Sequence, residues 1–192
     1  MKTLFSLIFA LVFLVGFGLT ACQRSQNVEA ARETIAGRDR STSFTADDKD
    51  FIDYAAEMHA GEIKLAELAK QKSSNEDVQE YADVVIANHT DALKELSDRT
   101  GQDRTPQTTT ASLDTENHAK YLTPLSAVKF DREFIALMIA DHKNAASAFK
   151  DQVSVTQNKE LTGYITEVQP GLDNALSKGE EVRKTLGLAK AK

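Results

Sequence analysis

Three polar side chains stand where a helical pattern otherwise places apolar residues, and together they could bind a transition metal. Glu62, His89 and His142 each interrupt a series of apolar residues spaced alternately three and four apart. A carboxylate oxygen and two imidazole nitrogens are a familiar ligand set for zinc, iron, manganese or copper. The sequence therefore predicts a site for one such divalent metal, with His59 and His118 as accessory ligands.

The same three residues also have a purely structural interpretation. Burying a carboxyl or imidazole group without a partner costs several kcal/mol, so the three must bond either to one another or to a ligand. A buried hydrogen-bond network that fixes the register of the helices would satisfy them as well as a metal would. The sequence leaves both interpretations open.

Signatures of known enzyme classes are absent from the sequence. The Glu-x-x-His pairs of ferritin-like oxidases are missing, because Ile86 and Ile139 stand three residues before His89 and His142. There is also no His-Glu-x-x-His zinc-protease motif, no Gly-x-Ser-x-Gly elbow and no glycine-rich phosphate loop. The sequence favours a protein without enzymatic activity.

Four long helices are predicted to carry the polar residues. The apolar pattern places these helices at residues 46–72, 75–99, 128–155 and 158–186. Thr45 and Ser74 are the predicted N-terminal caps of the first two, and Gly101 is the predicted stop of the second. Pro170 is predicted to bend or interrupt the fourth helix.

The connections between these helices predict how they are arranged. The turn at residues 73–75 is short and makes the first two helices antiparallel, whereas residues 102–127 form a long connection. A weaker helix in that connection would place on one side His118, Tyr121, Leu122 and Leu125. Two antiparallel pairs joined by a long crossover form a ferritin-like four-helix bundle. The predicted fold class is all-α, with the bundle domain over residues 45–190.

The start of the chain has the layout of a bacterial lipoprotein signal. A single lysine precedes an apolar run, and Leu19-Thr20-Ala21-Cys22 resembles a lipobox, whose cysteine takes a diacylglycerol before cleavage. The sequence predicts a signal peptide over residues 1–21 and a lipidated, flexible tether over residues 22–44. An uncleaved membrane helix is the alternative.

The only cysteine and the net charge limit the compartment and the partners. A lipid on Cys22 makes the membrane a partner, places the protein in the cell envelope and leaves no thiol for a disulfide. In a Gram-negative cell, Gln23 favours the outer membrane, facing the periplasm. The formal net charge of −6 argues against binding to nucleic acid. The sequence indicates no protein partner.

Several segments resemble a bacterial family, the domain of unknown function numbered 4142, which groups exported or lipid-anchored helical proteins with ferritin-like bundles. The resemblance covers residues 51–186 and rests on Ala55-Ala56 through Glu62, Leu65 to Ala69, the His89 helix, and Phe130-Asp131 with Phe134, Met138 and Asp141-His142. It implies the fold and brings no reaction.

Two departures from the family pattern weaken what the resemblance says about a metal. Asn88 precedes His89 where the family tends to have aspartate, and Ala175 stands near the position of a late histidine of the family.

Taken as a whole, the sequence predicts a membrane-tethered envelope bundle that binds a divalent transition metal through its Glu/His cluster. The alternative is a structural or protein-interaction module whose cluster is a hydrogen-bond network.

Overall fold

The computed structural model describes residues 43–188, and within that range it contains helices joined by turns and loops and no strand. In chain order the helices are α2 (Ala46–Lys72), α3 (Glu76–Thr100), α4 (Leu113–Leu122), α5 (Ala127–Val155) and α6 (Lys159–Thr185). None of these helices is both long and apolar enough to cross a bilayer. The predicted signal peptide, the lipidated Cys22 and nearly all of the predicted tether lie outside the described residues.

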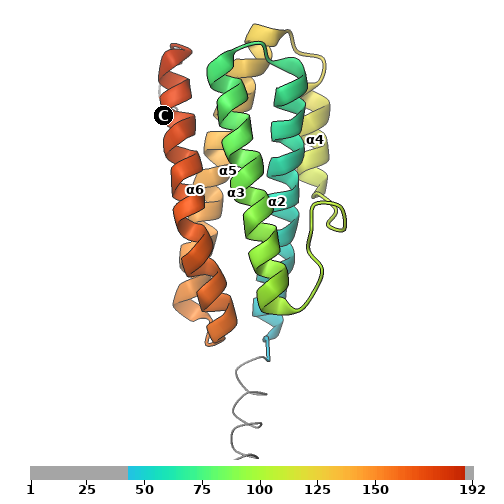
Figure 1. Ribbon diagram of the computed structural model, residues 1–192, viewed down its shortest axis with the longest axis vertical. Helices are drawn as coiled ribbons and strands as arrows, with labels where there is room; N and C mark the ends of the chain where they lie inside the picture. The colour runs from blue at the N-terminus through green and yellow to red at the C-terminus, as the bar shows by residue number, and fades with distance from the viewer. Residues whose placement is uncertain (1–42, 189–192) are drawn as a thin grey trace, which may run out of the picture. The chain divides into compact units, whose positions relative to one another are not determined.

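Four of the helices lie side by side as a bundle, and the fifth covers one side of it (Figure 1). α3 contacts α2 and α6, and α5 contacts α6 and α2, so the four long helices form a closed ring. The crossover that contains α4 returns along the length of the bundle, so α3 and α5 run in the same direction. The predicted all-α bundle with a long crossover between its second and third long helices is confirmed.

Two of the predicted helix ends are confirmed in atomic detail. Thr45 caps α2 through a capping box, in which the Thr45 hydroxyl accepts from the Asp48 N–H while the Asp48 carboxylate accepts from the Thr45 N–H. Gly101 ends α3 in the left-handed conformation, with φ of 69°. Both signals act within one helical turn, which makes them readable from sequence.

The predicted cap of the second helix is wrong by one residue. Asn75, and not Ser74, caps α3, because its side-chain oxygen accepts from the Val78 N–H at 3.2 Å. The preceding hydroxyl that takes part in the turn belongs to Ser73, which accepts from the Asn75 N–H at 3.1 Å. Ser73 and Asn75 therefore share the turn, and the helix begins at Glu76.

Two further sequence expectations differ from the structure. Helix α6 continues through Pro170, so the predicted interruption does not occur; the proline removes only one backbone hydrogen bond, and buried residues on both sides of it, such as Val168 and Leu172, hold the helix in the core. Tyr121 is 52% exposed, although Leu122 beside it is fully buried. The short helix α4 buries only a narrow face, which includes Leu122 but leaves Tyr121 outside it.

A polar layer divides the core of the bundle into two apolar clusters. On α3, Val85 belongs to one cluster and Ala92 to the other, and His89 lies between them. On α5, Met138 and Ala145 flank His142 in the same way. The apolar packing on both sides holds the helices that carry the polar layer.

The beginning of α2 is fastened to the turn between α5 and α6. The buried carboxylate of Asp48 accepts hydrogen bonds from the Thr156 hydroxyl at 2.7 Å and from the Gln152 amide at 3.0 Å. The Asn158 amide donates to the Ser43 carbonyl at 3.4 Å. These contacts join the first described residues to the opposite helix pair.

The crossover helix α4 lies close against α2 because α2 has a glycine at the contact. A Cβ atom on Gly61 would come within 2.3 Å of the Thr115 hydroxyl oxygen, so only glycine allows this approach. Lys64 pairs with Glu116, and the Lys72 ammonium donates to the Thr123 carbonyl at 2.6 Å. Helix α4 is thus docked next to Glu62.

Candidate metal centre

The structure brings the three predicted residues together in the middle of the bundle. Glu62 on α2, His89 on α3 and His142 on α5 each offer one ligand atom, and these atoms lie within 4.8 Å of one another. None of the three side chains is more than 3% exposed. Helical spacing alone places each of them on the inner face of its helix.

A series of hydrogen-bonded side chains runs through this cluster and includes residues from all four long helices; we call it the hydrogen-bonded chain. The Tyr164 hydroxyl on α6 lies 2.7 Å from His59 Nε2, and His59 Nδ1 lies 2.9 Å from His89 Nδ1. His89 Nε2 lies 3.2 Å from His142 Nε2, and His142 Nδ1 lies 2.7 Å from the Met138 carbonyl oxygen. One chain of contacts therefore links α6, α2, α3 and α5.

The Met138 carbonyl fixes the direction of every hydrogen bond in this chain. A carbonyl oxygen only accepts, so the hydrogen of neutral His142 is on Nδ1 and its Nε2 accepts. His89 must then donate from Nε2 and accept at Nδ1, which makes His59 the donor there. His59 Nε2 finally accepts from Tyr164. With three neutral rings, every ring nitrogen has a partner.

Burial keeps the three imidazoles neutral. Loss of water around the ring, with a smaller contribution from His142, lowers the pKa of His59 to about 3. The same loss of water lowers the pKa of His89 well below its usual value, with His59 and His142 adding to it. It also lowers the pKa of His142, and the bond to Met138 opposes this shift. Neutral imidazole is the form that binds metals.

Glu62 is the member of the cluster that the hydrogen-bonded chain does not satisfy. Its Oε2 atom is buried and has no hydrogen-bond partner, and it lies 3.8 Å from His142 Nδ1, which already donates to Met138. Burial, followed by the nearby charge of Asp141, raises the pKa of Glu62 well above its usual value. A buried carboxyl oxygen without a partner is costly unless a ligand completes it.

The two predicted accessory ligands have different positions. His59 is fully buried and bonds to His89, so it supports the ring of a predicted ligand from behind. His118 lies on α4 with its side chain 38% exposed, and its Nδ1 is 4.0 Å from the Asp141 carboxylate. His118 is therefore outside the cluster formed by Glu62, His89 and His142.

Sequence reasoning missed Tyr164, which ends the hydrogen-bonded chain on α6. The apolar series that the sequence predicts for that helix contains no polar residue and consists of Leu161, Ile165, Val168, Leu172, Ala175, Gly179, Val182 and Leu186. Tyr164 is nevertheless fully buried, next to Ile165. It stands three residues after Leu161 and four before Val168, which are both on the buried face. This spacing was the signal that could have identified Tyr164.

The comparison with protein families agrees with the resemblance seen in the sequence. A family model described as Domain of unknown function (DUF4142) matches residues 34–182. The chain belongs to the DUF4142 family. No curated protein and no solved structure matches it, so the relation to ferritin-like proteins stays a prediction.

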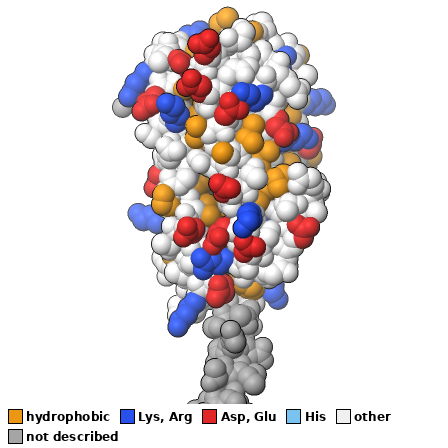
Figure 2. Space-filling view, viewed as in Figure 1, with side chains coloured by type: hydrophobic (Ala, Val, Ile, Leu, Met, Phe, Trp, Pro, Cys, Tyr) orange, Lys and Arg blue, Asp and Glu red, His pale blue; other side chains and the backbone are white. Residues whose placement is uncertain are grey.

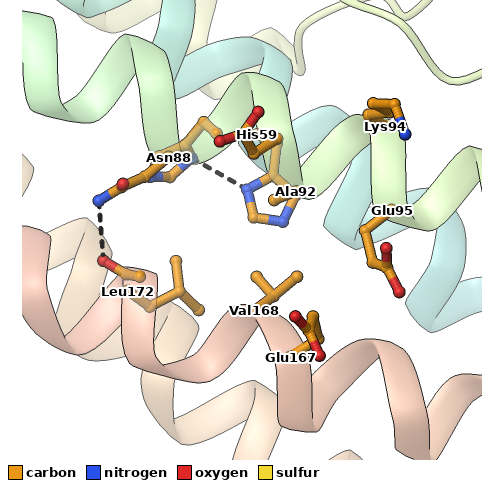
Figure 3. Close-up of a pocket in the computed structure, with 11 residues that line it drawn as sticks. His59, Asn88, Ala92, Lys94, Glu95, Glu167, Val168 and Leu172 are labelled. Atoms are coloured by element: carbon orange, nitrogen blue, oxygen red, sulfur yellow. Dashed lines mark hydrogen bonds between the residues drawn. The ribbon is translucent and has the colours of Figure 1, made fainter.

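Neither Asn88 nor Ala175 belongs to the cluster of possible ligands. Asn88 turns toward α6, where its amide donates to the Gly171 carbonyl at 3.1 Å (Figure 3). Ala175 is fully buried and offers no ligand atom. In this member of DUF4142, the polar centre is therefore made by α2, α3 and α5, and α6 contributes only the hydroxyl of Tyr164.

A pocket between α3 and α6 extends from the surface of the bundle to the polar centre. It has a volume of about 390 Å³, and His59 and His89 form part of its lining. Figure 3 shows His59 between these two helices, with Glu95 and Glu167 also lining the pocket. Lys94 contributes a positive charge to the same lining. In this DUF4142 protein the pocket thus extends to His59 and His89, although both side chains are buried.

Proposed function

We propose that the bundle binds one divalent transition metal through His89, His142 and Glu62. The observation that carries the proposal is the Glu62 oxygen, which is buried and without a partner beside two facing imidazole nitrogens. A hydrogen-bond network that served only the structure would be complete without this carboxyl group. A cation would give Glu62 the partner it lacks and would favour its ionised form.

The geometry of the two imidazoles supports the same function. Two nitrogens bound to a tetrahedral zinc ion at about 2.0–2.1 Å lie about 3.3–3.4 Å apart. The Nε2 atoms of His89 and His142 are 3.2 Å apart. Metal binding would move the His89 proton to Nδ1, so that His89 would donate to His59 and His59 would donate to the Tyr164 hydroxyl. The donation from His142 Nδ1 to a backbone carbonyl is the support that metal-binding histidines commonly have. Zinc, iron, manganese and copper all accept this set of ligands.

Zinc titration of the purified protein tests the proposal. We expect one ion per chain by calorimetry and a melting temperature that rises with zinc. Glu62→Gln should weaken binding by more than about tenfold, because even the loss of an outer partner of a ligand costs about 10–100-fold. Glu67→Gln, at an exposed position of the same helix, is the control and should bind as the wild type does.

The second candidate function is that of a structural module whose polar layer fixes the helix register. It is favoured by the observation that the hydrogen-bonded chain joins all four long helices. An unchanged melting temperature with zinc, manganese, iron and copper would reject the metal site and leave this candidate. If the protein does bind a metal, elemental analysis of protein isolated natively from its cells identifies which one.

We also propose that the bundle is tethered to a cell-envelope membrane by lipid on Cys22, as the lipobox-like segment indicates. Mass spectrometry of the mature protein should show an N-terminal cysteine that carries acyl chains. A Cys22→Ser variant should lack them and leave the membrane fraction. Detection of an intact Met1 in the mature protein would reject the anchor.

A further inference from the structure

A second cavity lies on the opposite side of the polar centre, beneath the crossover helix. It has a volume of about 280 Å³ and is enclosed by α2, α4 and α5. The titratable side chains that line it are Tyr54, Glu57, Glu62, Asp114, His118 and Asp141. We call it the access cavity.

The charges around the access cavity suit a cation. Its lining contains four acidic side chains and one histidine, and neither lysine nor arginine is among its lining residues. The pocket between α3 and α6 is lined by three acidic residues, Asp91, Glu95 and Glu167, and the charge of Lys94 offsets one of them. A concave surface with charges of one sign concentrates ions of the opposite sign. The access cavity therefore attracts cations more strongly than the pocket on the other side.

The access cavity connects solvent with the core of the bundle through Glu62. This residue lines the cavity although it is only 3% exposed, and its Oε2 atom has no hydrogen-bond partner. The same oxygen lies 3.8 Å from His142. Glu62 thus belongs both to the access cavity and to the buried centre.

His118 and Asp141 stand at the outer part of the cavity with side chains free to bind an ion. Their nearest atoms, His118 Nδ1 and Asp141 Oδ2, are 4.0 Å apart, which is too long for a hydrogen bond. The side chains are 38% and 28% exposed, so both reach solvent. Imidazole and carboxylate groups at this separation can hold one divalent ion between them.

We propose that His118 and Asp141, with Asp114 beside them, form an access site that takes a divalent transition-metal cation from solvent and passes it to Glu62. This inference rests on the proposed function of the buried centre. It assigns a role to the crossover, because the contact of Thr115 with Gly61 and the pairing of Lys64 with Glu116 hold α4 over the cavity. An access site changes how fast metal binds, whereas a ligand changes how tightly it binds.

The rate of cobalt binding separates these roles. In stopped-flow experiments with Co²⁺, the double variant His118→Ala/Asp141→Asn should bind and release the ion about tenfold more slowly than the wild type. Its dissociation constant should stay within about twofold, and the visible spectrum of the bound ion should not change. Asp114→Asn, at an exposed position on α4, should slow binding by a smaller factor and tests the site without touching α5.

The matched control is Asp91→Asn/Glu167→Gln, which removes two acids from the lining of the pocket between α3 and α6. This variant should bind Co²⁺ at the wild-type rate. The access site is rejected if the control slows binding and the His118/Asp141 variant does not, if neither does, or if the latter loses affinity through faster release. If the wild type binds no Co²⁺, the proposed function fails and the access site fails with it.

Discussion

Lowering the pH from 7 to 5 is expected to reduce the free energy of unfolding, and His59 alone should contribute about 2 kcal/mol to this loss. The three buried histidines have lowered pKa values in the folded protein, with that of His59 at about 3, against about 6.5 in the unfolded chain. Below pH 6.5 the unfolded chain therefore binds more protons than the folded one, and stability falls as the pH falls toward 3.

Glu62 acts in the opposite direction and limits this loss. Its raised pKa means that the folded protein keeps a proton above pH 4.5 that the unfolded chain releases, so its contribution falls as the pH rises. Because the pKa shifts of the histidines and of Glu62 act in opposite directions, the net loss of stability is smaller than the histidines alone would give.

Urea unfolding at pH 7, 6 and 5 measures this effect through the shift of the midpoint. His118→Ala is the control for the substitution itself, because it leaves the buried hydrogen-bonded chain intact. A midpoint that does not change over this pH range would show that the buried imidazoles take up protons without opening the bundle.

The substitution His89→Ala is expected to lower the free energy of unfolding by about 3–5 kcal/mol. His89 is 1% exposed and bonds to His59 on one side and to His142 on the other. Alanine leaves a buried donor on His59 and a buried acceptor on His142 without partners, and it also leaves a cavity. Thermal unfolding should show a decrease of about 10 °C for a domain of this size.

The chain supplies its own control for this substitution. His118→Ala removes a partly exposed histidine that makes no hydrogen bond within the described residues, and it should change the free energy of unfolding by less than about 0.5 kcal/mol. Equal effects at His89 and His118 would mean that the hydrogen-bonded chain adds nothing to stability.

The helices and three members of the polar centre could be predicted because their signals are local or periodic. Thr45 and Gly101 act within one turn of a helix end, and each of Glu62, His89 and His142 replaces an apolar residue in a regular series. The antiparallel pairing and similar helix lengths then bring the middle of one helix to the middle of the next.

The remaining contacts of the polar centre depend on how side chains on different helices are oriented toward one another, and the spacing of residues along one helix does not specify this. Which nitrogen faces which, and the role of the Met138 carbonyl, are set by how each ring is rotated against its neighbours. Tyr164 was overlooked because tyrosine is apolar over most of its surface, while its hydroxyl takes part in the chain. The access cavity exists only because α4 returns over α2, and no local pattern specifies that path.

The charged side chains on the visible face of the bundle form no patch of a single sign. Figure 2 shows acidic and basic side chains interspersed over the visible face, with apolar side chains between them. Pairs such as Lys143 with Glu180 and Lys70 with Asp83 are partly exposed and add little to stability.

The fastening of Asp48 has a mechanical consequence. A pull transmitted along the chain through Ser43 first loads the hydrogen bonds that Thr156 and Gln152 donate to Asp48, and the one that Asn158 donates to Ser43. These bonds share the tension between the first helix and the opposite pair, so α2 is not peeled from α3 one turn at a time. The end of the bundle at which the chain enters is thus reinforced against force.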